Sequence, residues 1–138
     1  MIAVWTMLIY GVPEFATTLA RLADCIAGDI LLGALVDAAQ PMADRMSDHA
    51  PRGPVAPHLA DSITVAPVRS DAVSAEVVIG PTKEFFYGMF WEFGWKYHAA
   101  HPFVRPGYDE TTNVVLALFA RHVWERIAAE GARGVSGP

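Results

Sequence analysis

Three side chains in the second half of the chain are of types that could do chemistry, namely Glu92, His98 and His101. Two histidines three residues apart can chelate a transition metal when both lie on one face of a helix, and a nearby carboxylate can add a ligand or act as a general base. Pro102 follows at once in a segment of loop composition, and no third histidine or cysteine is nearby, so helical chelation is not expected. A small metal-dependent hydrolase using these three residues is kept as the alternative function, and solvated loop histidines are the simpler interpretation.

Glu92 lies within a run, residues 85–95, in which seven of eleven side chains are aromatic. A lone carboxylate cannot be buried there without a large cost in free energy, so it must be paired or face solvent. It could be a general acid or base, but a structural ion pair or cap, with Arg105 as candidate partner, is the preferred interpretation. The aromatic run itself must be buried in the core or against a partner, and an exposed run would indicate a protein-binding module.

The motifs of common enzyme classes are missing from the sequence. The glycines are dispersed, with no phosphate-binding loop of either common type and no nucleophile elbow. The one cysteine, Cys25, has no catalytic signature around it and cannot form an internal disulfide. We therefore expect neither enzyme activity nor a cofactor.

Length and composition are typical of a single domain that spans residues 1–138. The chain is 53% hydrophobic and 18% charged, which indicates an ordered core. Its net charge of -5 and its scattered Lys and Arg residues provide no basic footprint of the kind that a duplex-DNA binder needs, so direct binding of nucleic acid is not expected. The apolar segments at 1–12 and 26–39 have neither the features of a signal peptide nor the length of roughly 20 residues of a membrane span, so a soluble protein is expected.

The elements that must position these side chains follow from the spacing of the apolar residues. Residues 2–10 are rich in β-branched and aromatic types and predict a strand. Residues 13–46 repeat apolar side chains at steps of three and four and predict a helix, broken near 39–40 because Pro41 removes a backbone donor. Residues 50–58 hold three prolines and a glycine and predict a mobile loop.

A hairpin is predicted next, with strands at 62–68 and 74–79. The turn between them, 69–73, contains serine and aspartate, which are favoured in turns. Pro67 cannot donate to a neighbouring strand, so the first strand should be bulged or at an edge. The aromatic composition of 85–95 predicts a further strand, which would be buried.

The chain should end in an amphipathic helix over about 107–130. Asp109 or Thr111 could cap its start, and Gly131 should end it before a flexible tail at 131–138. The expected fold class is therefore α+β. A small antiparallel sheet, made of the N-terminal strand, the hairpin and the aromatic strand, packs against a broken N-terminal helix and a C-terminal amphipathic helix.

Several segments together resemble a family of bacteriophage proteins. Residues 87–94 end in Glu-Phe-Gly, and after a variable loop residues 102–106 form Pro-Phe-Val-Arg-Pro before the final helix. The Ala-Pro and glycine of 50–53, the Leu-x-x-Ser-Ile of 59–63 and the helix entry at 11–15 follow the same order. This pattern resembles the gene-product-ten-like head–tail joining proteins of long-tailed phages and prophages, also called tail-completion or neck proteins.

The resemblance implies a structural virion subunit without catalysis, assembled in the cytoplasm of the host bacterium. It implies a homo-oligomeric ring at the phage neck, for which six copies is one option, that terminates the tail tube or joins it to the head. The implied partners are tail-tube and neck or stopper proteins. DNA would pass through the channel without sequence-specific binding, and an acidic chain suits such a wall. No membrane is involved.

The family-motif residues carry a structural or interface role under this resemblance: Tyr87, Glu92, Phe93, Gly94, Pro102, Phe103, Arg105 and Pro106. Gly94 should adopt a backbone that side chains forbid, Phe103 should anchor its segment to the core or a neighbouring subunit, and Arg105 could form a bidentate bond with Glu92. The chain departs from the family pattern at Trp95, where threonine is usual, and at Gly107, where alanine is common. We expect the 95–101 loop to be the contact that varies between assemblies.

Overall fold

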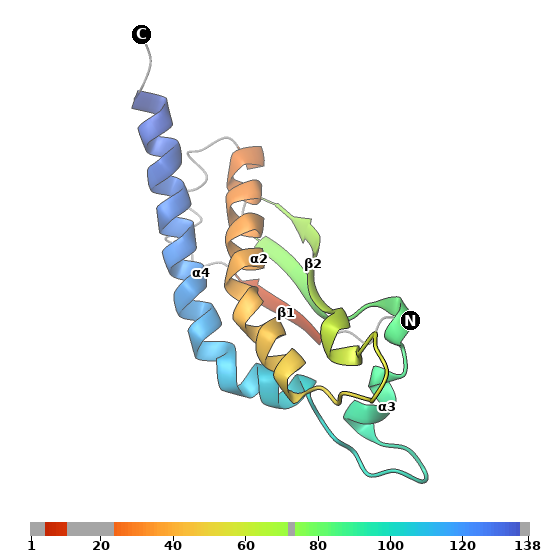
Figure 1. Ribbon diagram of the computed structural model, residues 1–138. Helices are drawn as coiled ribbons and strands as arrows, with labels where there is room; N and C mark the ends of the chain where they lie inside the picture. Colours follow the sequence, from red (N-terminus) through yellow and green to blue (C-terminus); the bar gives the residue numbers. More distant parts are fainter. Residues whose placement is uncertain (1–4, 11–23, 72–73, 136–138) are drawn as a thin grey trace.

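The computed structural model describes residues 5–10, 24–71 and 74–135, which form one sheet, two long helices and one short helix. Their bounds in chain order are β1 (Trp5–Tyr10), α2 (Asp24–His49), β2 (Ile63–Ser70), β3 (Ser74–Pro81), α3 (Gly88–Phe93) and α4 (Val104–Val135). Short 3-10 turns precede β2 at Leu59–Ser62 and follow β3 at Lys83–Phe85. The arrangement is α+β, as the sequence predicted (Figure 1).

The three strands form one antiparallel sheet in the order β1-β3-β2. Ile79 in the central strand lies opposite Trp5 on one side and Val65 on the other. The predicted hairpin and N-terminal strand are thus confirmed, although residues 2–4 lie outside the described part of the chain. The register shifts between Pro67 and Arg69 in β2, which is an edge strand of the sheet. Pro67 is therefore both at a bulge and at an edge, where its missing N–H does least harm.

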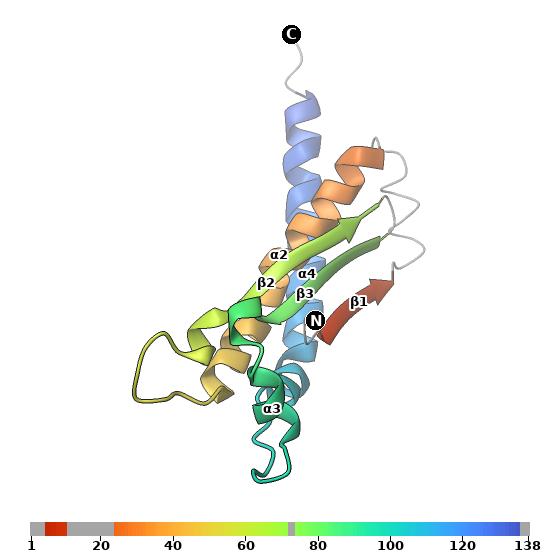
Figure 2. The ribbon, with the colours of Figure 1, turned by 90° about the vertical axis from the view of Figure 1, so that its right-hand side faces the viewer.

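α2 is the central element of the fold. It packs against β2 and β3 with one side and along α4 with another (Figures 1 and 2). Buried residues recur in adjacent pairs every four positions, at Ile30 and Leu31, Ala34 and Leu35, Ala38 and Ala39, and Met42 and Ala43. A buried sector of this width lets one helix cover a sheet and a second helix at once. The predicted helix before Asp24 lies outside the described residues.

The predicted break of this helix is wrong, because α2 runs unbroken through Pro41. Pro41 is only partly buried, whereas Ala39 and Met42 on either side of it are almost completely buried. The proline removes one backbone donor, but packing of the flanking turns on two neighbours outweighs that local cost. Tertiary contacts therefore override the local preference at this position.

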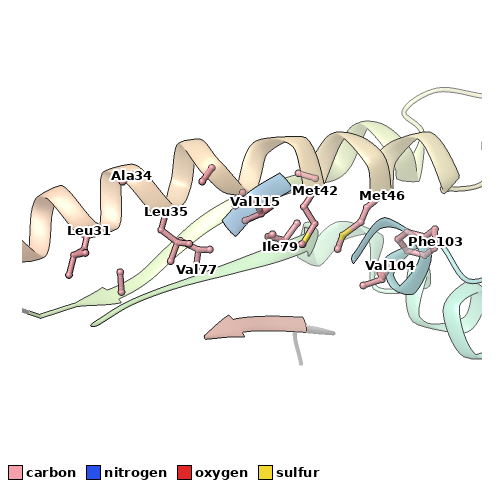
Figure 3. Close-up of a cluster of buried hydrophobic side chains, with 14 of the residues drawn as sticks. Leu31, Ala34, Leu35, Met42, Met46, Val77, Ile79, Phe103, Val104 and Val115 are labelled. Atoms are coloured by element: carbon pink, nitrogen blue, oxygen red, sulfur yellow. The ribbon is translucent and has the colours of Figure 1, made fainter. Parts of the chain in front are cut away.

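The core lies where α2 meets the sheet and the start of α4 (Figure 3). Leu35, Met42 and Met46 of α2 pack with Val77 and Ile79 of β3. Phe103, only 1% exposed, lies beside Met46 and fills the end of this core. Burial of a phenylalanine of this kind contributes roughly 1.5–3 kcal/mol.

α4 differs from the predicted helix at both ends. It begins at Val104, three residues before the expected start, and continues to Val135, past Gly131. Neither Asp109 nor Thr111 caps its start, since both lie inside the helix. The hydroxyl of Thr111 instead donates to the carbonyl of Gly107, 2.6 Å away.

The aromatic run does not form the predicted buried strand. Its central part is α3, a helix of six residues, which lies at one end of the molecule below the sheet (Figures 1 and 2). Gly88 begins α3 under Leu59, whose Cδ1 would lie 3.0 Å from any added Cβ. The high strand propensity of aromatic residues misled the sequence prediction, because that propensity reflects packing on a half-buried sheet that this segment does not join.

Candidate functional site

Glu92 connects α3 to the beginning of α4. Its side chain is 3% exposed. Oε2 accepts the backbone N–H of Phe103 at 2.7 Å and that of Val104 at 2.9 Å, and Oε1 accepts the N–H of Arg105 at 3.2 Å. Both carboxylate oxygens are therefore engaged by backbone donors, which is how a buried carboxylate avoids the penalty of desolvation.

These three bonds complete the first turn of α4. A helix leaves its first N–H groups without partners inside the helix, and a negative group near them also interacts well with the helix dipole. Glu92 serves Phe103, Val104 and Arg105, and Pro106 has no N–H to satisfy. The next donor, Gly107, reaches the carbonyl of Phe103 at 3.4 Å. Pro106 thus stands in the first turn of α4, a position that proline tolerates, and not before the helix as the expected start at 107 implied.

Arg105 plays a smaller part beside Glu92 than the sequence suggested. Its Nε lies 3.8 Å from Oε1 of Glu92, a long ion pair and not a bidentate bond. The guanidinium lies over the ring of Phe93, with Cζ 5.3 Å from the ring centroid. Half of the Arg105 side chain remains exposed, so its charge is presented on the surface together with that ring.

The two histidines do not join Glu92 in a metal site. His98 and His101 are exposed, while both oxygens of Glu92 are bound to backbone donors. Within residues 5–10, 24–71 and 74–135, no three His, Cys, Asp or Glu side chains gather to hold a metal ion. The alternative metal-dependent hydrolase would need Glu92 to leave its cap, which would leave buried N–H groups without partners.

The loop that follows α3 is a small, ordered hairpin. Gly94 has a φ of 73°, and a Cβ there would lie 2.8 Å from the backbone nitrogen of Ala100. Trp95 and His98 exchange two backbone hydrogen bonds of 3.0 Å, and their rings lie 4.7 Å apart. The N–H of His101 donates to the carbonyl of Trp91 at 2.7 Å. Glycine is required at 94 by both its backbone conformation and the close approach of the returning chain.

Most aromatic side chains of this region face outward. We call residues 86–97 the aromatic tip. It exposes six aromatic side chains, which are Phe86, Tyr87, Phe90, Phe93, Trp95 and Tyr97. The ring of Phe90 lies edge-on to that of Trp95 at 5.6 Å, and Phe85 and Trp91 pack against the core. Exposed apolar clusters of this kind are common on surfaces that bind other molecules.

The eight motif residues therefore divide into two groups. Glu92, Gly94, Phe103 and Pro106 build the joint between α3 and α4. Tyr87, Phe93, Pro102 and Arg105 reach the surface. Sequence reasoning did not single out Phe86, Phe90, Lys96 or Tyr97, although the aromatic density of the run was the signal that could have found most of them.

A second cluster of charged residues joins the end of α2 to α4 and was not predicted. Glu110 accepts a hydrogen bond from Nε of Arg45 and another, 3.0 Å long, from Nε2 of His49. The hydrogen bond from Arg45, and then that from His49, hold the pKa of Glu110 below its ordinary value. The same bond raises the pKa of Arg45. These residues are more than sixty positions apart, so no sequence pattern could have paired them.

Comparison with known proteins gives one match. A family model described as "Bacteriophage HK97-gp10, putative tail-component" matches residues 14–94, which are 81 of the 138 residues. The chain belongs to this bacteriophage tail-component family. The matched span contains α2, the hairpin and α3, and it ends at Gly94, the last residue of the Glu-Phe-Gly motif. The resemblance that the sequence indicated is confirmed.

No curated protein and no solved structure matches the chain. Phe103 and the rest of the Pro-Phe-Val-Arg-Pro segment lie beyond the span of the tail-component match, as does the loop at 95–101. Among the helices of the described ranges, none has an apolar stretch long enough to cross a bilayer.

Proposed function

We propose that this tail-component protein is a non-catalytic subunit of the phage neck, in the virion, which forms a ring that terminates the tail tube or joins it to the head. Membership of the tail-component family over residues 14–94 is the observation that carries the proposal. The exposed aromatic tip supports it, because a structural subunit needs surfaces that are covered only on assembly. The metal-dependent hydrolase is not favoured, since its carboxylate is committed to capping α4.

The proposed ring would surround DNA without gripping it. The chain carries 15 acidic and 10 basic residues and so has no excess of positive charge with which to hold phosphates. A channel wall of this composition lets DNA slide through the neck. The partners under this proposal are further copies of the chain, the tail-tube protein and the stopper protein of the same particle.

The proposal is tested by reconstitution with the tail-tube and stopper proteins of the same phage. Purified protein is analysed by light scattering and electron microscopy, alone and with assembled tubes. We expect rings with a central opening, or protein bound at the ends of tubes, and tubes of uniform length when the chain is present during assembly. A chain that remains monomeric and binds neither tubes nor stopper would remove the basis of the proposal.

A further inference from the structure

The aromatic tip has a defined shape before any partner binds. The backbone bonds between Trp95 and His98 close its loop, and the N–H of His101 ties the loop back to Trp91. Glu92 fixes the same segment to α4. Because the backbone that carries the rings is held in place in advance, less conformational entropy remains to be lost on docking, which favours binding.

The exposed charged residues in the tip and in the segments that flank it are mostly positive. Lys83 and Lys96 flank the rings, Arg105 lies over Phe93, and Glu84 is the one exposed acidic residue between positions 83 and 105, because Glu92 is buried. The ammonium of Lys96 lies 5.3 Å from the centroid of the Tyr97 ring. Aromatic rings with arginine among them are the residues that contribute most at protein interfaces. Arg105 also lies 3.8 Å from the carboxylate of Glu92, so Lys83 and Lys96 are the cations that a charge-reversal test can use.

The outer face of α2 carries the opposite charge. Asp29, Asp37, Asp44 and Asp48 are exposed and recur at intervals of eight, seven and four residues, which places them on one side of the helix. We call these four residues the acidic strip. Asp37 is paired with Arg126 of α4 and Asp48 lies 3.7 Å from Arg45, so Asp29 and Asp44 are the two members of the strip outside these ion pairs. Leu32 and Val36 lie on neighbouring turns and are partly buried against the core.

We infer that the aromatic tip of one copy docks on the acidic strip of a second copy of this chain. The two surfaces carry opposite charges, with Lys83 and Lys96 beside the exposed rings of the tip and Asp29 and Asp44 on the strip. They are also different surfaces of the same molecule, so each copy can use both at once. A contact between unlike surfaces runs head to tail and closes into a ring when the rotation permits, whereas a contact between like surfaces stops at a dimer. The inference rests on the proposed ring and names the contact that builds it.

Charge reversal tests this pairing directly. The tip-reversed chain carries Lys83→Glu and Lys96→Glu, and the strip-reversed chain carries Asp29→Lys and Asp44→Lys. All four positions are exposed and stand apart from the Arg126–Asp37 and Arg45–Glu110 pairs that tie α2 to α4. Circular dichroism and the unfolding midpoint should match those of the unchanged protein, so that a change in assembly is not a change in folding.

The unchanged chain should self-associate, and each reversed chain alone should associate at least about tenfold more weakly because like charges then face each other. An equimolar mixture of the two should assemble again, since each tip then meets a strip of opposite charge. One chain with all four substitutions should also assemble. The association of the unchanged protein should weaken between about 0.1 M and about 1 M salt, as expected for charges at the edge of an interface. Sedimentation velocity measures each of these.

A second pair of variants separates apolar from electrostatic contributions. Phe86→Ser and Tyr97→Ser remove rings that are 65% and 79% exposed, and should weaken association at least about tenfold without lowering thermal stability. Tyr108→Ser, which removes an exposed ring on α4 outside the tip, is the matched control and should assemble normally.

The outcomes distinguish this inference from the proposed function. If the unchanged chain forms rings and strip reversal leaves them intact, the pairing is wrong and the neck function stands. If only tip reversal matters and the mixture fails to assemble, the tip contacts something other than the strip, and the inference is overturned. If the chain assembles only on tail tubes, the same variants are compared by how much protein binds at the tube ends. Each reversed chain alone should then bind more weakly than the unchanged chain, and the mixture of the two should bind again. A chain that does not assemble in either setting overturns both proposals.

Discussion

Glu92 and Phe103 are joined by a 2.7 Å hydrogen bond between a buried carboxylate and a backbone N–H eleven residues away. The same carboxylate receives the N–H groups of the next two residues. One side chain of α3 thereby sets where α4 begins and holds the aromatic tip against the body of the protein. Phe103, once fixed, fills the end of the core beside Met46 (Figure 3).

Replacement of Glu92 by glutamine tests this joint. The amide keeps one oxygen acceptor, but its NH2 group would face backbone donors that then have no partner. We expect Glu92→Gln to lower the free energy of unfolding by about 1–3 kcal/mol. Urea denaturation followed by circular dichroism measures it. Glu84→Gln, an exposed carboxylate on the same segment, is the control and should change stability by less than about 0.5 kcal/mol. Equal stability of the two variants would contradict a structural role for Glu92.

The elements with strong local signals could be predicted from the sequence. The hairpin was found because alternating apolar residues surround a polar turn, and the bulge in β2 followed from Pro67. The buried positions of α2 at Ala34 and Leu35 followed from steps of three and four. In each case the residues that determine the structure lie close to one another in the sequence.

The site could be predicted only in part, because its partners are distant in sequence. Glu92 was expected to be paired or to act as a cap. The helix was expected to begin only near residue 107, so Arg105 was chosen as its partner in place of three backbone donors. The aromatic run was taken for a strand because single-residue propensities cannot tell that its rings stay outside. The Arg45–Glu110 pair spans 65 positions and depends wholly on how α2 and α4 pack.

Gly107 lies where α4 comes closest to Met46 of α2. A Cβ at Gly107 would lie 2.5 Å from Cγ of Met46 and 2.9 Å from its backbone nitrogen, so α2 and α4 touch here through their backbones. We expect Gly107→Ala to destabilise the protein by about 1–3 kcal/mol through overpacking, although alanine favours helices. Thermal denaturation measures it.

Gly131 is the matched control for this substitution, since it lies in the same helix with no atom within 4 Å of an added Cβ. Gly131→Ala should be neutral or stabilise the protein by up to about 1 kcal/mol. If Gly107→Ala were to stabilise the protein as much as Gly131→Ala, the close approach of the two helices at Met46 would be disproved.

The bonds from Arg45 and His49 to Glu110 predict a pH dependence of stability. Because the pKa of Glu110 is lower in the folded protein, the ionised carboxylate stabilises the fold above its ordinary pKa of about 4.3. That contribution is lost as the pH falls through the lowered value. The melting temperature of Glu110→Gln should therefore be below that of the unchanged protein near pH 7, and the two should converge in more acidic buffer.

The expected difference for Glu110→Gln is small, since the cluster is exposed and screened by solvent. It should shrink further with added salt. Glu84→Gln serves as the control and should follow the unchanged protein at every pH. A difference that stays constant from neutral to strongly acidic pH would show that the charge of Glu110 is not what stabilises the contact.

Gly94→Ala tests whether the shape of the aromatic tip, and not only its composition, matters for assembly. With φ at 73° and ψ at 171°, residue 94 occupies a region of backbone space that is nearly restricted to glycine, and an added Cβ would meet the backbone of Ala100. We expect a loss of about 1–3 kcal/mol in the free energy of unfolding, or a rearranged loop in which Trp95 no longer packs on His98. Tryptophan fluorescence and circular dichroism separate these two results. Gly53→Ala, with open space around its Cβ, is the control.

If the tip docks as a preformed surface, self-association should weaken in Gly94→Ala even under conditions where the protein remains fully folded. The exposed rings are all retained in this variant, and only their arrangement is lost. Unchanged association with a rearranged loop would mean that the rings act without a fixed geometry.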